Sequence, residues 1–223
     1  MISYLGLSHL SLCYAASALK NGYKVNIYDF ERTINFFKKN KIVYEKNLDS
    51  ILNKYKSNLT ITSNFKKIKN SKLIFLAKDL NTDKLNKPKI NEINKLINKI
   101  KMYKKNKILI ILTQVPVSFC RQLDWNKNNL YHYVETLIFG QGISRALKPE
   151  RIILGKKHFN KKVHPFLRKF LKKYKCPLIE MSFEESEMTK AFINIYLASQ
   201  LMTTNFLSEV SNFYSARWDK IME

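Results

Sequence analysis

Two residues near the C-terminal end of the chain, Lys190 and Asn194, have types and a spacing that suit the binding of a negatively charged reaction centre. They lie four positions apart in a stretch without Pro or Gly, so a helix would place both on one face. A lysine supplies a positive point charge and an asparagine a neutral donor, which together can stabilise an oxyanion. A solvated helix face also explains such a pair, and the two residues alone leave both interpretations open.

A turn near the N-terminus carries a second chemical signal. Residues 6–11 follow a predicted strand and open a predicted helix, with Gly6, Ser8 and Ser11 at the positions that are glycines in a dinucleotide-binding turn. Asp29 ends the second strand, about 20 residues further on, where an acidic residue can accept hydrogen bonds from a ribose hydroxyl. Asp29 could instead be a turn residue that closes a strand. The strand–turn–helix context favours a dinucleotide site.

Histidine and cysteine residues give weaker signals. His9 lies at the start of the first helix, near the expected pyrophosphate, and Cys13 lies in the interior of that helix. With Cys120 and Cys176, Cys13 forms an odd set without C-x-x-C spacing, which is typical of a reducing compartment. We therefore expect no disulfide framework and no metal site. We interpret His9 as incidental and Cys13 as a core residue.

The elements that must position these residues alternate between short β-branched runs and amphipathic stretches. Strands are predicted at residues 2–5, 24–28, 59–62, 73–77, 108–112, 131–134, 151–154 and 177–180. Helices are predicted at residues 10–20, 31–39, 48–56, 91–104 and 164–174. This alternation predicts an α/β fold, a Rossmann-like, doubly wound and mostly parallel sheet with both faces covered.

The pattern changes at about residue 183. Residues 184–214 contain no Pro or Gly and are predicted to form one long helix, with Ser182 as N-cap and Glu184 and Glu185 in the first turn. A helix of roughly 30 residues is about 45 Å long, so we expect it to pack against another domain or subunit. We predict a dinucleotide-binding domain at residues 1–182 and a central, dimerising helix at 183–223.

Composition restricts the class of protein. The 223 residues are 45% hydrophobic, which is typical of a globular chain, and carry a formal net charge of +23. Lysines are scattered along the sequence without the interleaved aromatic residues of a single-strand binding groove, so nucleic-acid binding is not favoured. The longest clear apolar run, 108–112, is strand-sized, and the N-terminus lacks a basic signal region. These features predict a cytoplasmic protein without a membrane span.

Several stretches, in this order and at compatible spacing, resemble the UDP-glucose/GDP-mannose 6-dehydrogenase family. Residues 73–77 are similar to its fourth strand, and 113–117 resemble its S-T-V-P-V turn. Glu135 stands where the family has the Glu of N-P-E-F, and residues 148–155 resemble N-P-D-R-I-V-I-G. Residues 187–198 resemble the segment A-E-M-x-K with N-x-F-L-A that opens the central helix.

This resemblance implies an NAD-dependent oxidation of a nucleotide sugar, as from UDP-glucose to UDP-glucuronate, in the synthesis of surface polysaccharide precursors. It implies catalytic roles for Glu135, Lys190 and Asn194: Lys190 and Asn194 would hold developing negative charge and a water, and Glu135 would act as acid–base or water-positioning group. The cofactor would be bound by Gly6, Ser8, Ser11, Asp29 and Gln114. It also implies a nucleotide-sugar substrate and either a homodimer through the long helix or a separate C-terminal half.

The sequence departs from the family pattern at several positions. The family's nucleophilic Cys lies in a G-G-x-C segment well beyond the central helix, whereas this chain ends at Glu223, and none of its three cysteines corresponds to that residue. We therefore expect that the chain ends before the family's C-terminal domain. Other departures fall in the cofactor site: Ser8, Ser11, Gln114, Phe139, the pair Tyr133 and Val134, and the segment 78–80.

Three functions remain open from the sequence. The chain could be a dehydrogenase part that another half completes. It could be a degenerate, non-catalytic relative that binds a nucleotide or dimerises, or it could be a basic module that binds anionic polymers.

Overall fold

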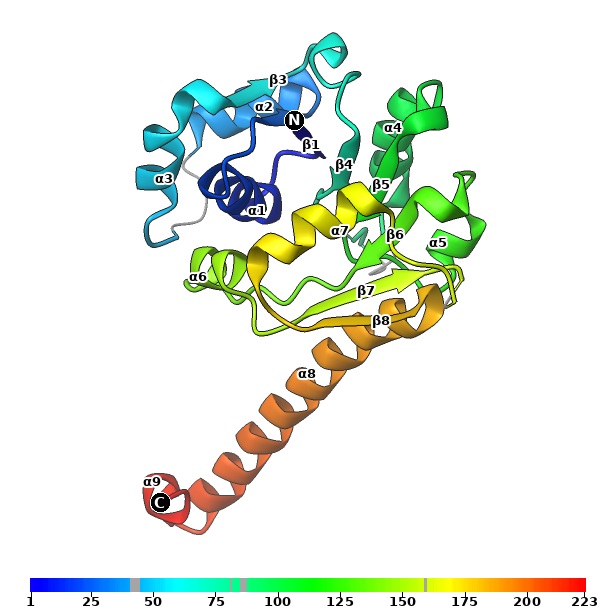
Figure 1. Ribbon diagram of the computed structural model, residues 1–223. Helices are drawn as coiled ribbons and strands as arrows, with labels where there is room; N and C mark the ends of the chain where they lie inside the picture. The colour runs from blue at the N-terminus through cyan, green and yellow to red at the C-terminus, as the bar shows by residue number, and fades with distance from the viewer. Residues whose placement is uncertain (41–44, 81, 85–87, 159) are drawn as a thin grey trace.

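The computed structural model describes residues 1–223 except 41–44, 81, 85–87 and 159. Within the described residues, eight strands form one sheet in the order β3-β2-β1-β4-β5-β6-β7-β8, crossed by helices on both faces (Figure 1). The strands are β1 (Ile2–Leu5), β2 (Val25–Tyr28), β3 (Leu59–Thr62), β4 (Leu73–Leu76), β5 (Ile108–Ile111), β6 (Leu130–Tyr133), β7 (Ile152–Lys156) and β8 (Leu178–Ser182).

All neighbouring strands pair in parallel except β6 and β7, which pair antiparallel through His132 with Gly155 and Tyr133 with Leu154. The chain runs from β1 outward to β2 and β3, then returns to place β4 on the other side of β1. Doubly wound sheets bind ligands where the strand order reverses in this way, at the carboxyl ends of the strands. The predicted fold class is therefore confirmed, with one antiparallel pair that the sequence pattern does not distinguish.

Side chains of the central strands alternate between two apolar layers. Phe75 and Ile110 pack in one layer, whereas Ile74 and Ile111 pack in the other. The first layer lies under α1 (His9–Lys20), α6 (Gly142–Leu147) and α7 (Pro165–Leu171), and the second under α4 (Ile90–Lys101) and the short α5 (Phe119–Gln122). Because these strands are buried on both faces, their sequences are continuous runs of hydrophobic residues instead of alternating patterns.

The remaining helices are shorter or lie at the edge. They are α2 (Glu31–Lys39), α3 (Leu48–Lys54) and α9 (Trp218–Ile221), with single 3-10 turns at Lys56–Asn58, Phe65–Lys67, Lys104–Asn106, Lys127–Asn129 and Lys172–Tyr174. Two predicted helices, 48–56 and 164–174, thus end in 3-10 turns instead of regular α-helix. None of the helices in the described part of the chain is long and apolar enough to cross a membrane.

The long helix α8 (Phe183–Phe213) leaves the body and carries the C-terminal α9 at its far end (Figure 1). Ser182 caps it as predicted: its hydroxyl accepts from the Glu185 amide, and the Glu185 carboxylate accepts from the Ser182 amide. Its first turns pack on the sheet, where Ser186 Oγ lies 2.9 Å from the buried His132 Nδ1. A Cβ at Gly155 would lie 1.9 Å from Ser186 Oγ, so β7 can approach this closely only with a glycine there.

Candidate functional site

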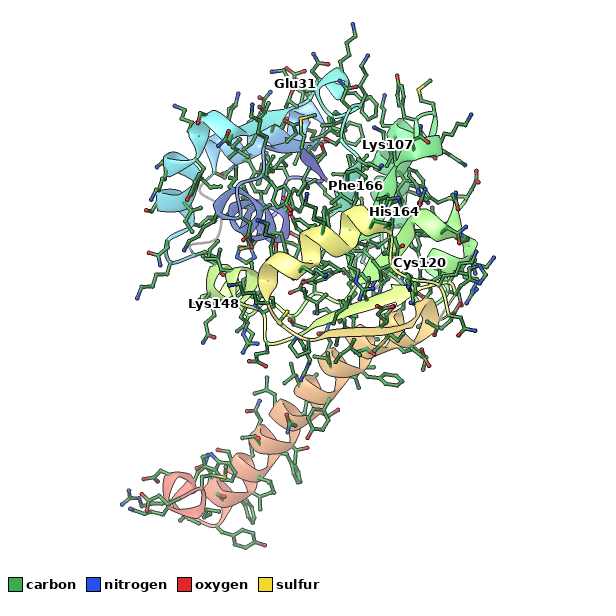
Figure 2. All side chains as sticks on the ribbon, viewed as in Figure 1. Glu31, Lys107, Cys120, Lys148, His164 and Phe166 are labelled. Atoms are coloured by element: carbon green, nitrogen blue, oxygen red, sulfur yellow. The ribbon has the colours of Figure 1, made fainter. Side chains whose placement is uncertain are left out.

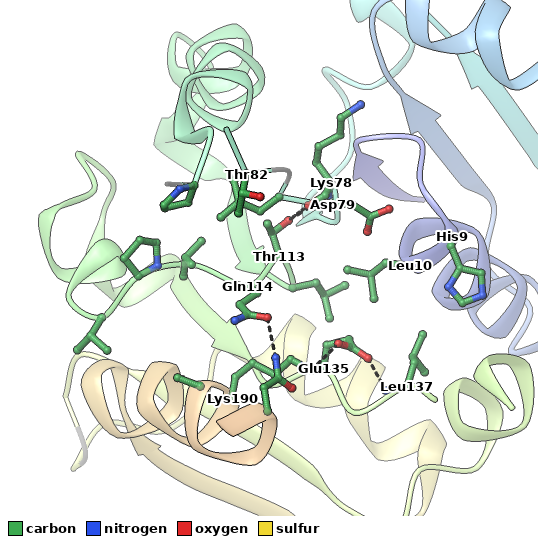
Figure 3. A pocket seen from close by; sticks show the side chains of 18 of the residues that line it. His9, Leu10, Lys78, Asp79, Thr82, Thr113, Gln114, Glu135, Leu137 and Lys190 are labelled. Atoms are coloured by element: carbon green, nitrogen blue, oxygen red, sulfur yellow. Dashed lines mark hydrogen bonds and ion pairs between the residues drawn. The ribbon is translucent and has the colours of Figure 1, made fainter. Parts of the chain in front are cut away.

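A cavity of about 810 Å³ opens at the carboxyl ends of the central strands. Its wall includes residues from the start of α1, the segment after β4, the turn after β5, the segment after β6 and the third and fourth turns of α8. This volume falls within the range of about 300–1,000 Å³ that is usual for ligand pockets. The cavity therefore lies where the strand order predicts a ligand (Figure 3).

Four of the residues singled out from the sequence meet in this cavity: Gln114, Glu135, Lys190 and Asn194. The Lys190 ammonium lies 2.9 Å from the Glu135 carboxylate, with only 14% and 15% of the two side chains exposed. Asn194 Nδ2 donates to Gln114 Oε1 over 3.0 Å (Figure 3). The spacing of four on α8 thus brings a cation and an amide to one wall, with a carboxylate facing the cation.

The position of α8 relative to this wall depends on a buried carboxylate, Glu187. One oxygen accepts from the Ser118 amide over 2.6 Å and the other from the Cys120 amide over 2.8 Å. Burial raises the pKa of Glu187, and the two amides oppose that shift. Because this carboxylate fastens the helix to the turn after β5, it also sets where Lys190 lies. Sequence reasoning noted Glu187 only as part of a motif and missed this positioning role.

The N-terminal turn has the geometry of a phosphate cradle. Gly6 has a φ of +101°, and a Cβ there would lie 2.7 Å from Lys78 Cα, so a glycine is required by both conformation and space. The first turn of α1 presents backbone N–H groups that have no carbonyl partner within the helix. Such a helix start favours an anionic group. His9 and Leu10, the first two helical residues, line the cavity.

Ser8 and Ser11, which stand at glycine positions of the expected turn, are not among the residues that line the cavity. The two form a capping box, in which Ser8 Oγ accepts from the Ser11 amide and Ser11 Oγ from the Ser8 amide. Ser8 Oγ also donates to the Ala77 carbonyl over 2.7 Å. Both residues are buried, so their side chains cap α1 and join it to β4 instead of lining the wall.

Asp29, which the sequence predicted as an acceptor for a ribose hydroxyl, accepts hydrogen bonds from the protein itself in this structure. Its carboxylate is fully buried and accepts from the amides of Leu7 and Phe30, each over 2.7 Å. The Lys78 ammonium completes the set at 2.8 Å from Asp29 Oδ2. The acidic residue at the end of β2 is therefore present, but a lysine from the segment after β4 lies against it. Sequence reasoning noted Lys78 only as a departure from the family pattern.

Asp79, the next residue, adds a carboxylate to the wall of the cavity. Its side chain is open to the cavity, yet nearby protein atoms desolvate it and raise its pKa, against a lowering by His9 and Lys78. Thr113, also on the wall, connects the turn after β5 to the segment that carries Asp79: its Oγ1 accepts a hydrogen bond from the Lys78 amide over 3.0 Å. Asp79 is a polar residue that follows a buried strand, and this position could have identified it as a candidate site residue. Sequence reasoning did not use that signal.

Comparisons with known proteins agree with this fold. In solved structures, the fold is similar to GDP-mannose dehydrogenase of Pseudomonas aeruginosa, with a TM-score of 0.85 at 18% identity, covering 99% of this chain and 55% of that one. It is also similar to a UDP-glucose dehydrogenase of Pyrobaculum islandicum, with a TM-score of 0.84 at 17% identity, covering 99% and 55%. The chain thus spans about half the length of these enzymes.

A curated protein of Methanocaldococcus jannaschii, itself of uncharacterized function, is 27% identical over 226 residues, which is 95% of this chain and 25% of that protein. The sequence model of the UDP-glucose/GDP-mannose dehydrogenase family, NAD binding domain, matches residues 1–174. The chain accordingly belongs to the UDP-glucose/GDP-mannose dehydrogenase family, as its NAD-binding domain with the long helix that follows.

Proposed function

We propose that residues 1–223 form the front half of an NAD-dependent nucleotide-sugar 6-dehydrogenase of the UDP-glucose type, acting in polysaccharide precursor synthesis. The observation that carries the proposal is the meeting of Lys190, Asn194, Glu135 and Gln114 on one cavity wall, beside the start of α1. A cavity with a phosphate-binding helix start at one end and a cation–amide pair at the other suits a dinucleotide beside an alcohol substrate.

The fit of this chain to NAD rests on its own residues. The positive φ of Gly6 and its close contact with Lys78 keep the turn tight, and the start of α1 would bind the pyrophosphate. Asp29 would accept from a ribose hydroxyl once Lys78 moves aside, and Gln114 would contact the nicotinamide side. NAD supplies a hydride acceptor. Ser8 and Ser11 would act indirectly, by capping the helix whose amides face the phosphates.

In the sugar half of the site, Lys190 and Asn194 would stabilise the negative charge that develops on the sugar oxygen as a hydride leaves carbon. Glu135 would accept or position the proton, because it already lies against Lys190 and faces the same cavity. The ion pair also keeps the Lys190 ammonium from swinging into solvent.

The three cysteines of the chain do not suit the second oxidation, which requires a thiolate nucleophile. Burial, and then Glu45, raises the pKa of Cys13 to about 12. Burial likewise raises the pKa of Cys120 and, to a smaller extent, that of Cys176. A covalent thiohemiacetal step would therefore need a thiol from outside these residues, as the G-G-x-C segment of the resemblance implies.

The dehydrogenase proposal is tested by NADH formation from UDP-glucose, with residues 1–223 alone and with a C-terminal half supplied. We expect no uronic acid from residues 1–223 alone, and NADH when the halves are combined. Lys190→Ala should lower that rate about 100-fold or more, since an oxyanion-stabilising charge is lost. Thr189→Ala should leave it unchanged, because the Thr189 hydroxyl donates to its own helix backbone. Equal rates for the two variants would contradict an oxyanion-stabilising role for Lys190.

The Lys78–Asp29 pair should weaken NAD binding, because a ribose hydroxyl must compete with an ammonium for the carboxylate. Lys78→Ala should raise NAD affinity about fivefold, equivalent to about 1 kcal/mol for a displaced ion pair. It should also lower the free energy of unfolding by about 1–3 kcal/mol, because a buried carboxylate loses a donor. Calorimetric titration with NAD and urea unfolding measure the two effects.

Lys95→Ala is the matched control for this variant, since Lys95 is an exposed residue of α4 and its loss changes the net charge equally. A fall in NAD affinity for Lys78→Ala would instead mean that Lys78 is itself a phosphate ligand.

The carboxylate of Asp79 should oppose the pyrophosphate, so NAD should bind better when Asp79 is protonated. Because the pKa of Asp79 is raised, NAD affinity should increase as the pH falls toward that pKa. Asp79→Asn should remove this dependence and increase the affinity at pH 7 about two- to fivefold. NAD titrations at a series of pH values, with the exposed Asp49→Asn as control, provide the measurement. An unchanged pH profile in Asp79→Asn would show that another group is responsible.

A second candidate function, a non-catalytic relative that binds a nucleotide or dimerises, is favoured by the same Lys78–Asp29 pair, because it occupies the ribose-binding carboxylate. Absence of saturable NAD binding in both the wild-type protein and Lys78→Ala would support this alternative over the dehydrogenase.

We also propose that α8 pairs with α8 of a second copy of the chain. Side chains project from the outer part of α8 without other segments over them (Figure 2). The large apolar residues among them include Met202 and Phe206, which are 72% and 63% exposed. An apolar stripe of this kind marks an interaction site. A pair of helices can bury the stripe along its length.

The proposed dimer predicts a twofold mass in light scattering at micromolar concentration. Replacing both Met202 and Phe206 by Glu should give the monomer, because two charges would be buried in the contact. The double variant with Gln200→Glu and Asn205→Glu, which adds the same charge at exposed polar positions of α8, should remain a dimer. A monomeric wild-type protein would overturn this part of the proposal.

A further inference from the structure

Three potential metal ligands meet behind one end of the cavity: His9, Cys13 and Glu45. His9 and Cys13 lie one turn apart on α1, and Glu45 comes from the segment before α3. His9 Nε2 is 2.8 Å from Glu45 Oε1 and 3.6 Å from Cys13 Sγ. All three donor atoms lie within 4.8 Å of one another, and Cys13 and Glu45 are buried. The side chains of this cluster have no role in the function proposed above, which uses only the backbone amide of His9.

The distances suit a shared ion. Donors about 2.0–2.3 Å from a tetrahedral zinc ion lie roughly 3.3–3.6 Å apart. The separation of 3.6 Å between Sγ and Nε2 already matches this range, whereas the contact of 2.8 Å between Nε2 and Oε1 would have to open by roughly half an ångström. The His9 side chain is 12% exposed and lines the cavity wall. A single imidazole nitrogen faces both a thiol and a carboxylate, although it carries at most one proton to donate.

The segment around α6 closes over the cluster and orients its carboxylate. The amides of Gly140 and Gly142 donate to Glu45 Oε1 and Oε2 over 2.9 and 3.0 Å. A Cβ at Gly142 would lie 3.0 Å from both Cys13 Sγ and Glu45 Oε1, so the backbone comes as close as a glycine permits. Hydrogen bonds of this kind to a ligand, from outside the coordination sphere, are typical of metal sites.

We propose that His9 Nε2, Cys13 Sγ and Glu45 Oε1 bind one zinc-class divalent cation, with a fourth position open toward the cavity. Imidazole, thiolate and carboxylate are ligands that zinc accepts, and the thiolate and carboxylate charges balance the ion. The Sγ–H proton is released to solvent when the Sγ–metal bond forms. Binding should therefore tighten as the pH rises.

The competing explanation is a hydrogen-bonded triad that holds α1, residue 45 and α6 together without any ion. It predicts the same contacts but no affinity for metal and no thiolate. Substitutions at Cys13 or His9 would then change stability alone.

Zinc and cobalt titrations of the purified protein, freed of metal by a chelator and kept reduced, distinguish the two explanations. We expect one Zn²⁺ per chain by calorimetry and a thiolate-to-cobalt absorption band on addition of Co²⁺. Cys13→Ser and His9→Gln should each weaken Zn²⁺ binding about 100-fold or more, and Cys13→Ser should abolish the band. Zn²⁺ should also raise the thermal midpoint of the wild-type protein, because it binds the folded state.

Cys176→Ser and His164→Gln are matched controls, since both residues lie outside the cluster, and each should keep the band and the affinity. Circular dichroism establishes that each variant is folded. If the wild-type protein binds no stoichiometric Zn²⁺, or if the cobalt band survives in folded Cys13→Ser, the site does not exist and the triad is only structural.

Discussion

The buried carboxylate of Asp29 is the interaction on which the arrangement of the site depends. A charge without solvent is costly unless donors surround it, and here the donors come from three separate segments: the Leu7 amide after β1, the Phe30 amide after β2 and the Lys78 ammonium after β4. Satisfying one carboxylate therefore fixes the ends of three neighbouring strands relative to one another. It holds the Gly6 turn tight and directs the start of α1 into the cavity.

A second buried carboxylate, Glu187, fixes the position of α8 beside the cavity. By accepting from the amides of Ser118 and Cys120 it fastens the first turns of α8 to the turn after β5. Lys190 and Asn194 then reach the cavity from a helix whose outer part carries exposed large apolar side chains. The inner end of α8 thus packs against the sheet and the turn after β5, and its outer end exposes large apolar side chains.

Much of the fold could be predicted from the sequence, because its strands are buried on both faces and its helices are amphipathic. The start of α8 was predicted because Ser182 and Glu185 carry the cap in their residue types alone. The antiparallel pairing of β6 with β7 could not be predicted, because hydrophobic runs do not encode strand direction. The meeting of Lys190 with Glu135 came from resemblance, since nothing local relates residues 55 positions apart.

The N-terminal turn has side-chain contacts that sequence reasoning did not predict. Serines at glycine positions suggested contact with the ligand, yet Ser8 and Ser11 are polar groups in an apolar setting and turn to the nearest backbone donors and carbonyls. Lys78 and Asp29 are far apart in the sequence, and no helix or strand period relates their positions, so their pairing could not be predicted. The His9, Cys13 and Glu45 cluster was missed for the same reason: its spacing matches no zinc motif, and only the packing of Glu45 and of the segment after β6 against α1 brings it together.

A crystal structure of the chain with NAD tests the central claim most directly. If the start of α1 and Asp29 form the cofactor site, the pyrophosphate lies at the amides of His9 and Leu10, the adenosine ribose contacts Asp29, and the Lys78 ammonium has left that carboxylate. NAD bound elsewhere, or bound with the Lys78–Asp29 pair intact and no contact to the start of α1, would contradict that claim.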